Sequence, residues 1–146
     1  MKLYEYEGAL LFAQHGIPVP EHFVFDQVPN NLNLEPPLMV KAQVLVGDRQ
    51  RAGGIIVAAT VAAAQQAIQC LLTKEIDNEP VKQVMVTKKL DVDKEYYISL
   101  SYDTVSRGPV LALSTEGGTG IDRARVFPID SILGLPAFLI RQHLVE

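Results

Sequence analysis

Cysteine and long apolar runs are the two features that this sequence most clearly lacks. A single cysteine, Cys70, stands among 146 residues, which excludes an internal disulfide and a metal site built from several cysteines. No apolar stretch approaches the roughly 20 residues that a helix needs to span a bilayer. The first 16 residues carry acidic side chains within their apolar stretch and no small-residue cleavage site. We therefore expect no signal peptide and a soluble, cytoplasmic protein.

An excess of positive charge is also lacking, because 17 aspartate and glutamate residues outnumber 13 lysine and arginine residues. The formal net charge is −4, which argues against nonspecific binding to nucleic acid and to anionic membranes. Apolar residues make up 48% of the chain and charged residues 21%, a composition that can bury a core and is not typical of disorder. The length suits one domain of ordinary size or two small lobes.

Periodicity and turn residues predict an α+β fold with antiparallel or mixed sheets and flanking helices. A helix is expected over about 4–15, because apolar residues recur there at helical spacing and Gly16 is a natural stop. A short turn separates apolar strands at 38–45 and 53–59, so these strands should form an antiparallel pair. The apolar positions of the first helix are Leu3, Tyr6, Leu10 and Ala13.

The second half of the chain continues the mixed pattern. A helix should begin after Thr60, a good N-cap, and 81–88 alternates as a strand does. Further strands are expected over 95–103 and 108–115, and the last segment, from residue 131, reads as a loop followed by a helix. The apolar face of the helix after Thr60 consists of Val61, Ala64, Ile68, Leu71 and Leu72.

Lys41 is the most informative single residue, because it lies inside an apolar strand. Alternation places it on the same face as Met39 and Gln43. A lysine held on a strand near backbone N–H groups can serve as a fixed cation over a polyphosphate. A solvent-facing lysine on a half-exposed strand fits the same pattern equally well, so both interpretations stay open.

The loop from Gly47 to Gly54, with the sequence GDRQRAGG, could supply those N–H groups. Glycines such as Gly53 permit backbone angles that let successive N–H groups converge on an anion. Arg49 and Arg51 would add positive charge, whereas Asp48 would repel a phosphate. A hairpin turn that carries a solvated charge cluster would have the same composition.

Other polar residues give weaker signals. Glu95 begins an aromatic strand and could accept two hydrogen bonds from a ribose diol, although an ordinary charge at a strand edge is the commoner case. His15, His22 and His143 are far apart and have no metal-ligand spacing, so we treat them as structural. The glycine-rich loop EGGTG at 116–120 matches no dinucleotide-binding fingerprint.

Four separated segments together resemble one family. They are MKLYEYEGALLFAQHGIPVP, VKAQVLVGDRQRAGG, DKEYYISLSYD and STEGGTGID, and they occur in the order and spacing of the β subunits of ADP-forming succinyl-CoA synthetases. The related ATP-grasp chains of ATP-citrate lyase and malate–CoA ligase are similar. The resemblance extends over essentially the whole chain.

This resemblance implies an ATP-grasp site for Mg-ATP between a small lid lobe, about residues 20–90, and a larger lobe that includes 1–19 and 91–146. Such enzymes make an acyl-CoA through an acyl-phosphate and a phosphohistidine on a partner α subunit. By the family pattern Lys41 contacts nucleotide phosphates, Gly47 to Gly54 forms the glycine loop, and Glu95 holds the ribose. Pro20 stands where GTP-preferring forms look to carry glutamine, which favours adenine.

The sequence departs from the family pattern at several positions. Asp48 and Gln50 replace glycines, Arg51 replaces a lysine, and Thr87 replaces an acidic residue that usually ends its strand. Each charge change in a solvent-screened loop should alter binding by about 1 kcal/mol, so weakened nucleotide binding is expected rather than none.

The chain also ends before the family segment that supplies the magnesium ligands, which we therefore expect outside this chain. We predict that the chain is not catalytic alone. It would act with a ligase α subunit, with the missing C-terminal half of the β chain, or with both. The alternative is a degenerate paralogue that serves as a non-catalytic interaction or regulatory subunit. The apolar run at 132–140 predicts association with a partner or with a second copy.

Overall fold

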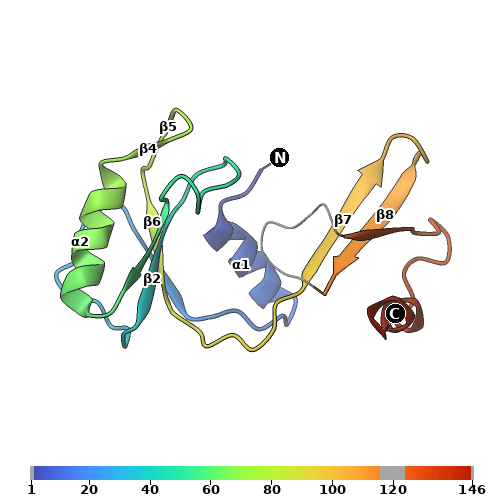
Figure 1. Cartoon of the computed structure of the whole chain (residues 1–146), viewed down its shortest axis with the longest axis horizontal. Helices are drawn as coiled ribbons and strands as arrows, with labels where there is room; N and C mark the ends of the chain where they lie inside the picture. The colour runs from blue at the N-terminus through green and yellow to red at the C-terminus, as the bar shows by residue number, and fades with distance from the viewer. Residues whose placement is uncertain (1, 116–123, 146) are drawn as a thin grey trace. The chain divides into compact units, whose positions relative to one another are not determined.

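A computed structural model describes residues 2–115 and 124–145 of the chain. The chain divides into two compact units, Met1–Leu90 and Asp91–Glu146 (Figure 1). Each unit combines antiparallel strands with helices, so the predicted α+β class is confirmed. The loop predicted at 116–120 lies outside the described residues. In the part of the chain that the structure describes, no helix is long and apolar enough to cross a membrane.

The first unit is built on a four-stranded antiparallel sheet with the order β1-β6-β2-β3. The predicted pairing of 38–45 with 53–59 is confirmed by β2 and β3, whose register places Val40 opposite Ile56. Both strands are shorter than predicted, and β1 was not predicted. The strands are β1 His22–Phe25, β6 Val84–Lys88, β2 Leu38–Ala42 and β3 Ile55–Ala58.

Strand β6 lies at the centre of this sheet, between β1 and β2. The alternation predicted over 81–88 does not hold within β6, because Val84, Met85 and Val86 are consecutive apolar residues and every residue from Val84 to Thr87 is buried. A continuous apolar run suits a strand that has neighbours on both sides and cover on both faces, so the pattern of β6 agrees with its place in the sheet.

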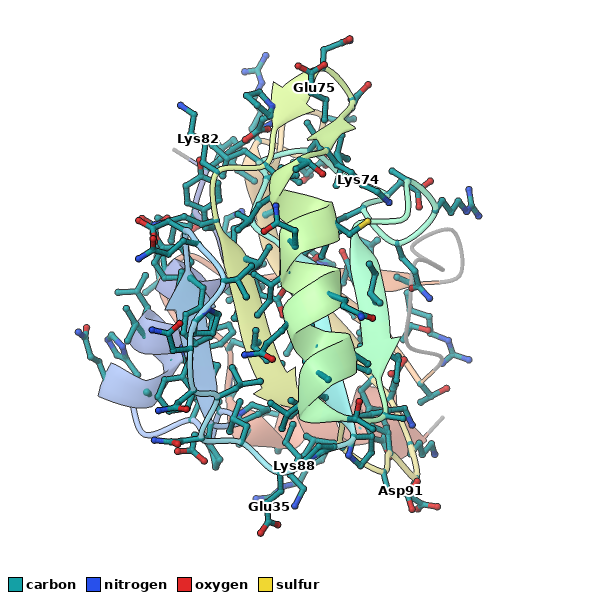
Figure 2. All side chains as sticks on the ribbon, turned by 90° about the vertical axis from the view of Figure 1, so that its left-hand side faces the viewer. Glu35, Lys74, Glu75, Lys82, Lys88 and Asp91 are labelled. Atoms are coloured by element: carbon teal, nitrogen blue, oxygen red, sulfur yellow. The ribbon has the colours of Figure 1, made fainter. Side chains whose placement is uncertain are left out.

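Helix α2, Val61–Leu72, packs against β2, β3 and β6. Figure 2 shows it lying lengthwise in front of the strands. The predicted N-cap is confirmed, since the hydroxyl of Thr60 accepts a hydrogen bond from the backbone N–H of Ala63 at 3.1 Å. The helix buries Ala64, Ala67, Ile68 and Leu71, whereas Val61 and Leu72 are only half-buried. Cys70 is a free, exposed thiol near the end of this helix.

Helix α1, Glu5–Gln14, is present where the sequence predicts it and ends at Gly16, whose φ of +75° a glycine adopts readily. A capping box begins it, because the Glu7 carboxylate accepts a hydrogen bond from the Tyr4 N–H at 2.8 Å. The apolar positions of α1 do not form a core face, however. The helix has no buried residue, and Leu10 is 53% exposed.

A short hairpin completes the first unit. It pairs β4, Glu75–Ile76, with β5, Glu79–Pro80, through a turn in which Asp77 and Asn78 have φ of 51° and 63°. Asparagine and aspartate tolerate this left-handed region better than other residues do. The side chain of Ile76 is buried beneath the hairpin and belongs to the main core.

The second unit contains a three-stranded antiparallel sheet with the order β7-β8-β9, and the helix α3, Ala137–Val145. The predicted strands 95–103 and 108–115 are confirmed as β7, Tyr97–Asp103, and β8, Gly108–Ser114. Strand β9, Arg125–Pro128, was not predicted. The turn of the β7–β8 hairpin is closed by Asp103, whose carboxylate accepts hydrogen bonds from the N–H groups of Val105 and Ser106 at 3.2 and 2.8 Å.

Candidate functional site

The two faces of β2 have different roles. Leu38, Val40 and Ala42 are buried in the core that α2 covers. Alternate residues of a strand point to opposite faces, so Met39 and Lys41 face the other way. The ammonium group of Lys41 donates to Oε1 of Glu5 in α1 at 2.7 Å, which places α1 over this second face. The predicted alternation at Lys41 is thereby confirmed.

Glu5 also contacts the glycine loop. Its second carboxylate oxygen, Oε2, forms an ion pair with Nη2 of Arg49. The other guanidinium nitrogen of Arg49, Nη1, donates to the carbonyl of Ala42 at 2.9 Å. Arg49 therefore ties the loop both to the end of β2 and to α1, while Glu5 bridges Arg49 and Lys41.

The Glu5–Lys41–Arg49 cluster is largely shielded from solvent. The side chains of Lys41, Arg49 and Glu5 are 19%, 20% and 31% exposed. Burial raises the pKa of the Glu5 carboxyl, but the hydrogen bonds and positive charges of Lys41 and Arg49 outweigh it, and the net result is a lowered pKa. Glu5 is thus ionised at neutral pH and stays paired with both cations.

The glycine loop closes on itself through its own backbone. Three successive N–H groups donate to carbonyls within the loop, so their hydrogen-bonding capacity is used internally. These bonds run from Ala52 to Asp48 at 3.2 Å, from Gly53 to Gln50 at 3.0 Å, and from Gly54 to Arg49 at 2.8 Å. The loop therefore has a defined compact shape in this structure.

Backbone conformation and close packing explain why glycine occurs at two positions of the loop. Gly53 has a φ of +69°, and its carbonyl accepts a hydrogen bond from the ammonium of Lys74 at 3.3 Å. Lys74 follows the end of α2, where Figure 2 labels it. A Cβ at Gly54 would lie 2.6 Å from Cδ1 of Ile76 and 2.8 Å from Cγ of Arg49, so only glycine fits there.

The remaining loop residues lie at the surface. Arg51 forms an ion pair with Asp48 at 3.2 Å, and the two side chains are 78% and 50% exposed. Asp48 has a φ of 55°, a conformation that aspartate tolerates where most residues do not. A Cβ at Gly47 would meet no atom within 4 Å, so this glycine has no packing role in the described structure.

A cavity of about 430 Å³ lies between α1 and the sheet. It brings together Lys41 and two other positions that the sequence singles out, Pro20 and Thr87. Thr87 is almost fully buried, and its hydroxyl donates to the carbonyl of Lys88 at 3.0 Å. The full lining is Leu3, Tyr4, Glu5, Gly8, Ala9, Phe12, Val19, Pro20, His22, Lys41, Met85 and Thr87.

Glu95 belongs to the second unit, whereas Lys41 and the glycine loop belong to the first. It is exposed and lies in the segment that leads into β7. The neighbouring Lys94 ammonium lies 5.2 Å from the centre of the Tyr96 ring, a cation–π arrangement. The structure thus joins Lys41 and Arg49 in one cluster, and it describes Glu95 in a separate unit.

Among the residues that the structure describes, the histidines form no metal site. His22 lines the cavity, and its Nδ1 lies 3.0 Å from the carbonyl of Pro20. The Nδ1 of His15 lies 2.8 Å from the carbonyl of Leu11 in its own helix. Within residues 2–115 and 124–145, no group of three or more histidine, cysteine, aspartate and glutamate side chains could hold a metal ion.

Glu5 is a member of the candidate site that the sequence analysis did not single out. In sequence it reads as one of two acidic residues in the first turn of a helix, a common arrangement that favours the helix dipole. Its partners Lys41 and Arg49 lie 36 and 44 residues away, so no local spacing marks the contact.

Comparison with known proteins shows which domain contains the Glu5–Lys41–Arg49 cluster. The model of the ATP-grasp domain matches residues 2–127. The chain is 40% identical over 124 residues to the succinate–CoA ligase [ADP-forming] subunit beta of Methanocaldococcus jannaschii, covering 84% of this chain and 34% of that protein. It is 32% identical over 155 residues to the same subunit of Bacteroides thetaiotaomicron, covering 97% and 41%. The chain therefore spans between a third and about two fifths of the length of these relatives.

Solved structures share its fold. The ATP citrate lyase of Methanothrix soehngenii, solved with citrate and coenzyme A, has a TM-score of 0.70 at 18% identity, covering 92% of this chain and 36% of that one. A dinucleotide-forming acetyl-coenzyme A synthetase 1 of Ca. Korarchaeum cryptofilum, solved with coenzyme A, Ca-AMPCP and HgCl+, has a TM-score of 0.67 at 16% identity, covering 87% and 60%. At these identities the likeness concerns the fold alone.

Proposed function

Because this chain belongs to the ATP-grasp family, as the sequence resemblance predicted, we propose that it is the nucleotide-binding N-terminal portion of an ADP-forming acyl-CoA ligase β chain of the succinate–CoA ligase type. The observation that carries the proposal is the position of Lys41. Its partly buried ammonium lines a cavity of about 430 Å³ together with Pro20 and Thr87. A shielded cation beside a largely apolar cavity suits a ligand with a charged phosphate end and an apolar base.

The proposed roles follow from the contacts. Lys41 would bind the phosphates of ATP, and Arg51, which is exposed, would add positive charge at the loop. Gly53 and Gly54 would shape the loop together with Arg49, because the loop backbone is already closed by internal hydrogen bonds. Gly47 would leave the outer part of the loop open to the ligand.

We propose that Glu95, which lies in the second unit, is the residue that binds the ribose, as the family pattern implies. We propose that about 20–90 form the lid lobe and that 1–19 and 91–146 belong to the larger lobe. The division of the chain after Leu90 supports the boundary between 90 and 91, whereas the same division groups 1–19 with 20–90 in the first unit.

Magnesium that is bound together with a nucleotide is held by one or two carboxylates, by water and by the phosphates themselves rather than by a dedicated protein cluster. Residues 2–115 and 124–145 contain no group of three or more histidine, cysteine, aspartate and glutamate side chains that could hold a metal ion. As the family pattern implies, we propose that the magnesium ligands lie outside this chain and that the residues here would serve only to bind and orient the nucleotide.

Ligation of an acid to coenzyme A would need further polypeptide. The chain spans about a third of the M. jannaschii β subunit. We propose that it works in the cytoplasm with the remaining β-chain sequence and a ligase α subunit. Ile132, Leu133 and Phe138 are 95%, 79% and 64% exposed, which supports association, with a partner or a second copy, through the C-terminal segment.

The alternative of a non-catalytic paralogue rests on the unusual residues Asp48, Gln50 and Thr87. Asp48 is paired with Arg51, which offsets its repulsion of an anion. Thr87 is buried and hydrogen-bonded rather than aimed at the loop. The relatives found by comparison are named as ligase subunits, and none of them supports a non-catalytic role.

The test is calorimetric titration of the chain with ATP in the presence of magnesium, beside Lys41→Met. Methionine keeps the apolar stem of the side chain and removes its charge. Losing one charge-assisted contact should weaken binding by about tenfold or more. Lys82→Met, a matched change at an exposed lysine that does not line the cavity, should bind as the natural chain does. Equal affinity of Lys41→Met and the natural chain would disprove the proposed site.

A further inference from the structure

Glu5 occupies the position that an anionic ligand of Lys41 would be expected to take. One carboxylate oxygen accepts from the Lys41 ammonium at 2.7 Å, and the other pairs with the guanidinium of Arg49. A phosphate is bound in proteins by the same set of donors, an ammonium and a guanidinium that converge on neighbouring oxygens. Each oxygen of Glu5 thus stands where a phosphate oxygen would find its donor.

The two cations are not equivalent. Both terminal nitrogens of Arg49 are engaged, one by Glu5 and one by the carbonyl of Ala42, and its side chain packs against Gly54. Lys41 lines the cavity, and an ammonium has three donors, of which Glu5 takes one. An incoming anion would therefore meet Lys41 first, while Arg49 stays fixed.

Glu5 lines the same cavity as Lys41, so a ligand there meets both charges. Two positive charges, on Lys41 and Arg49, face one negative charge, on Glu5, which leaves a net of one positive charge in the cluster. The outer pair of Arg51 and Asp48 adds none. The site is therefore much less electropositive than its number of basic residues indicates.

Building on the proposed function, we propose that Glu5 is an affinity- and specificity-determining residue of the phosphate subsite. It acts as an internal counter-ion that competes with the ligand's phosphate for Lys41. Only a ligand with enough negative charge to displace or share this contact binds well, so polyphosphates are selected over singly charged anions. In the unliganded chain the same contact keeps two shielded cations paired, which avoids the cost of leaving charges unpartnered.

The experiment compares Glu5→Gln with the natural 146-residue chain by calorimetry, using inorganic triphosphate and Mg·ATP as probes. Glutamine keeps the size and one acceptor oxygen but removes the competing charge. Both probes should bind about tenfold more tightly, and inorganic phosphate, titrated as a third probe, should gain more affinity than triphosphate does. Glu7→Gln is the matched control, because it makes the same change in the same helix at a residue that contacts the Tyr4 N–H instead. Its affinity should be unchanged.

Unchanged or weaker binding of both probes by Glu5→Gln would overturn the inference, because Glu5 would then only support Lys41. If Glu5→Gln does not fold, Glu5→Asp decides, since its shorter side chain can reach only one cation and should bind triphosphate with intermediate affinity. Unchanged affinity in Glu5→Asp would overturn the inference in the same way.

The proposed function and this inference fail in different ways. Suppose that the natural chain binds ATP, that Lys41→Met abolishes this binding and that Glu5→Gln does not strengthen it. The proposed function would then stand, and the inference about Glu5 would be overturned. Triphosphate binding that Glu5→Gln strengthens, with no ATP binding by either chain, would support the counter-ion and overturn the nucleotide function. Absence of binding for every probe in every variant would overturn both.

Discussion

In the first unit a helix closes one face of the sheet, whereas in the second unit the sheet stays largely open. Fifteen buried apolar residues form one continuous core in the first unit. Among the described residues of the second unit only Val110, Leu111 and Leu113 are buried apolar side chains. On the outer strand β7 of that sheet, Ile98 and Leu100 are 62% and 67% exposed.

Pairing across the strands explains this difference. Ile98 lies opposite Leu113 and Leu100 opposite Leu111, so each pair shares one face of the sheet. The inner member of each pair is covered and the outer member is not. The three-stranded sheet and its single helix cover only the inner member of each pair. The first unit holds its site residues on a continuous core, whereas the second unit leaves apolar side chains of β7 exposed.

The largest expected effect separates the two cores. Leu71→Ala removes a fully buried side chain between α2 and the sheet and should destabilise the first unit by about 2–5 kcal/mol. The matched change Leu100→Ala, on exposed β7, should alter stability by less than about 0.5 kcal/mol. Urea denaturation followed by circular dichroism measures both. Comparable losses in the two variants would show that the second unit has a core as complete as that of the first.

A second pair of variants tests whether the glycine loop is packed into the core of the first unit. Gly54→Ala places a methyl group 2.6 Å from Cδ1 of Ile76 and 2.9 Å from the carbonyl oxygen of Arg49, so it should cost about 1–3 kcal/mol. Gly47→Ala meets no atom within 4 Å and should be close to neutral. Thermal unfolding of both chains tests the difference. A neutral Gly54→Ala would mean that the loop is not anchored on Ile76.

The smallest effect concerns acid stability. The folded pKa of Glu5 lies below its ordinary value of 4.5 because the attraction of Lys41 and Arg49 outweighs burial. Its ion pairs therefore contribute stability above about pH 4.5, and that contribution is lost as the pH falls through the folded pKa. In the second unit the pKa values of Asp103 and Asp130 are also lowered, by hydrogen bonds from nearby residues, chiefly Ser106 and Leu133 respectively. As the pH falls, protonation of these two carboxylates likewise removes the stability that their hydrogen bonds contribute.

We would record denaturation curves from about pH 7 to about pH 3 for the natural chain and for Glu5→Gln. The comparison separates the pH-dependent stability of the first unit from that of the second. Asp103 and Asp130 contribute equally to both chains, so only Glu5 changes the difference between them. That difference should be greatest near neutral pH and vanish in acid. A difference independent of pH would show that Glu5 is not ionised and paired in the folded chain.

Local patterns in the sequence predicted the elements that local forces determine. The hydroxyl of Thr60 and the apolar spacing after it were sufficient to predict α2, because capping and helical periodicity act within a few residues. The β7–β8 hairpin followed from two apolar runs and a turn that begins at Asp103. The apolar run Val84, Met85 and Val86 is typical of a strand buried on both faces, but the neighbours of β6 could not be predicted, since strand order depends on contacts between distant segments.

The site was predicted only in part for the same reason. Lys41 stands out because a lysine in an apolar strand is locally unusual, and its face of the strand was predicted correctly. Arg49 was expected to face a ligand, but the structure engages it with Glu5 and Ala42, through contacts that no spacing reveals. Asp48 was expected to repel phosphate. Its pairing with Arg51 depends on its positive φ, which could not be predicted from the sequence.

Helix α1 has no buried residue, so polar contacts such as those of Glu5 hold it to the sheet. The backbone N–H of Tyr6 adds one more, to Oε1 of Gln43 at 3.3 Å. A ligand that takes Lys41 away from Glu5 must loosen the docking of α1, and thermodynamic reciprocity then requires that tighter docking of α1 weakens the ligand. A molecule that binds the exposed apolar side chains Leu10 and Leu11 only while α1 is docked would therefore lower nucleotide affinity from outside the cavity. Phosphate binding should therefore be detectable as a change in the hydrogen exchange of the backbone amides of α1.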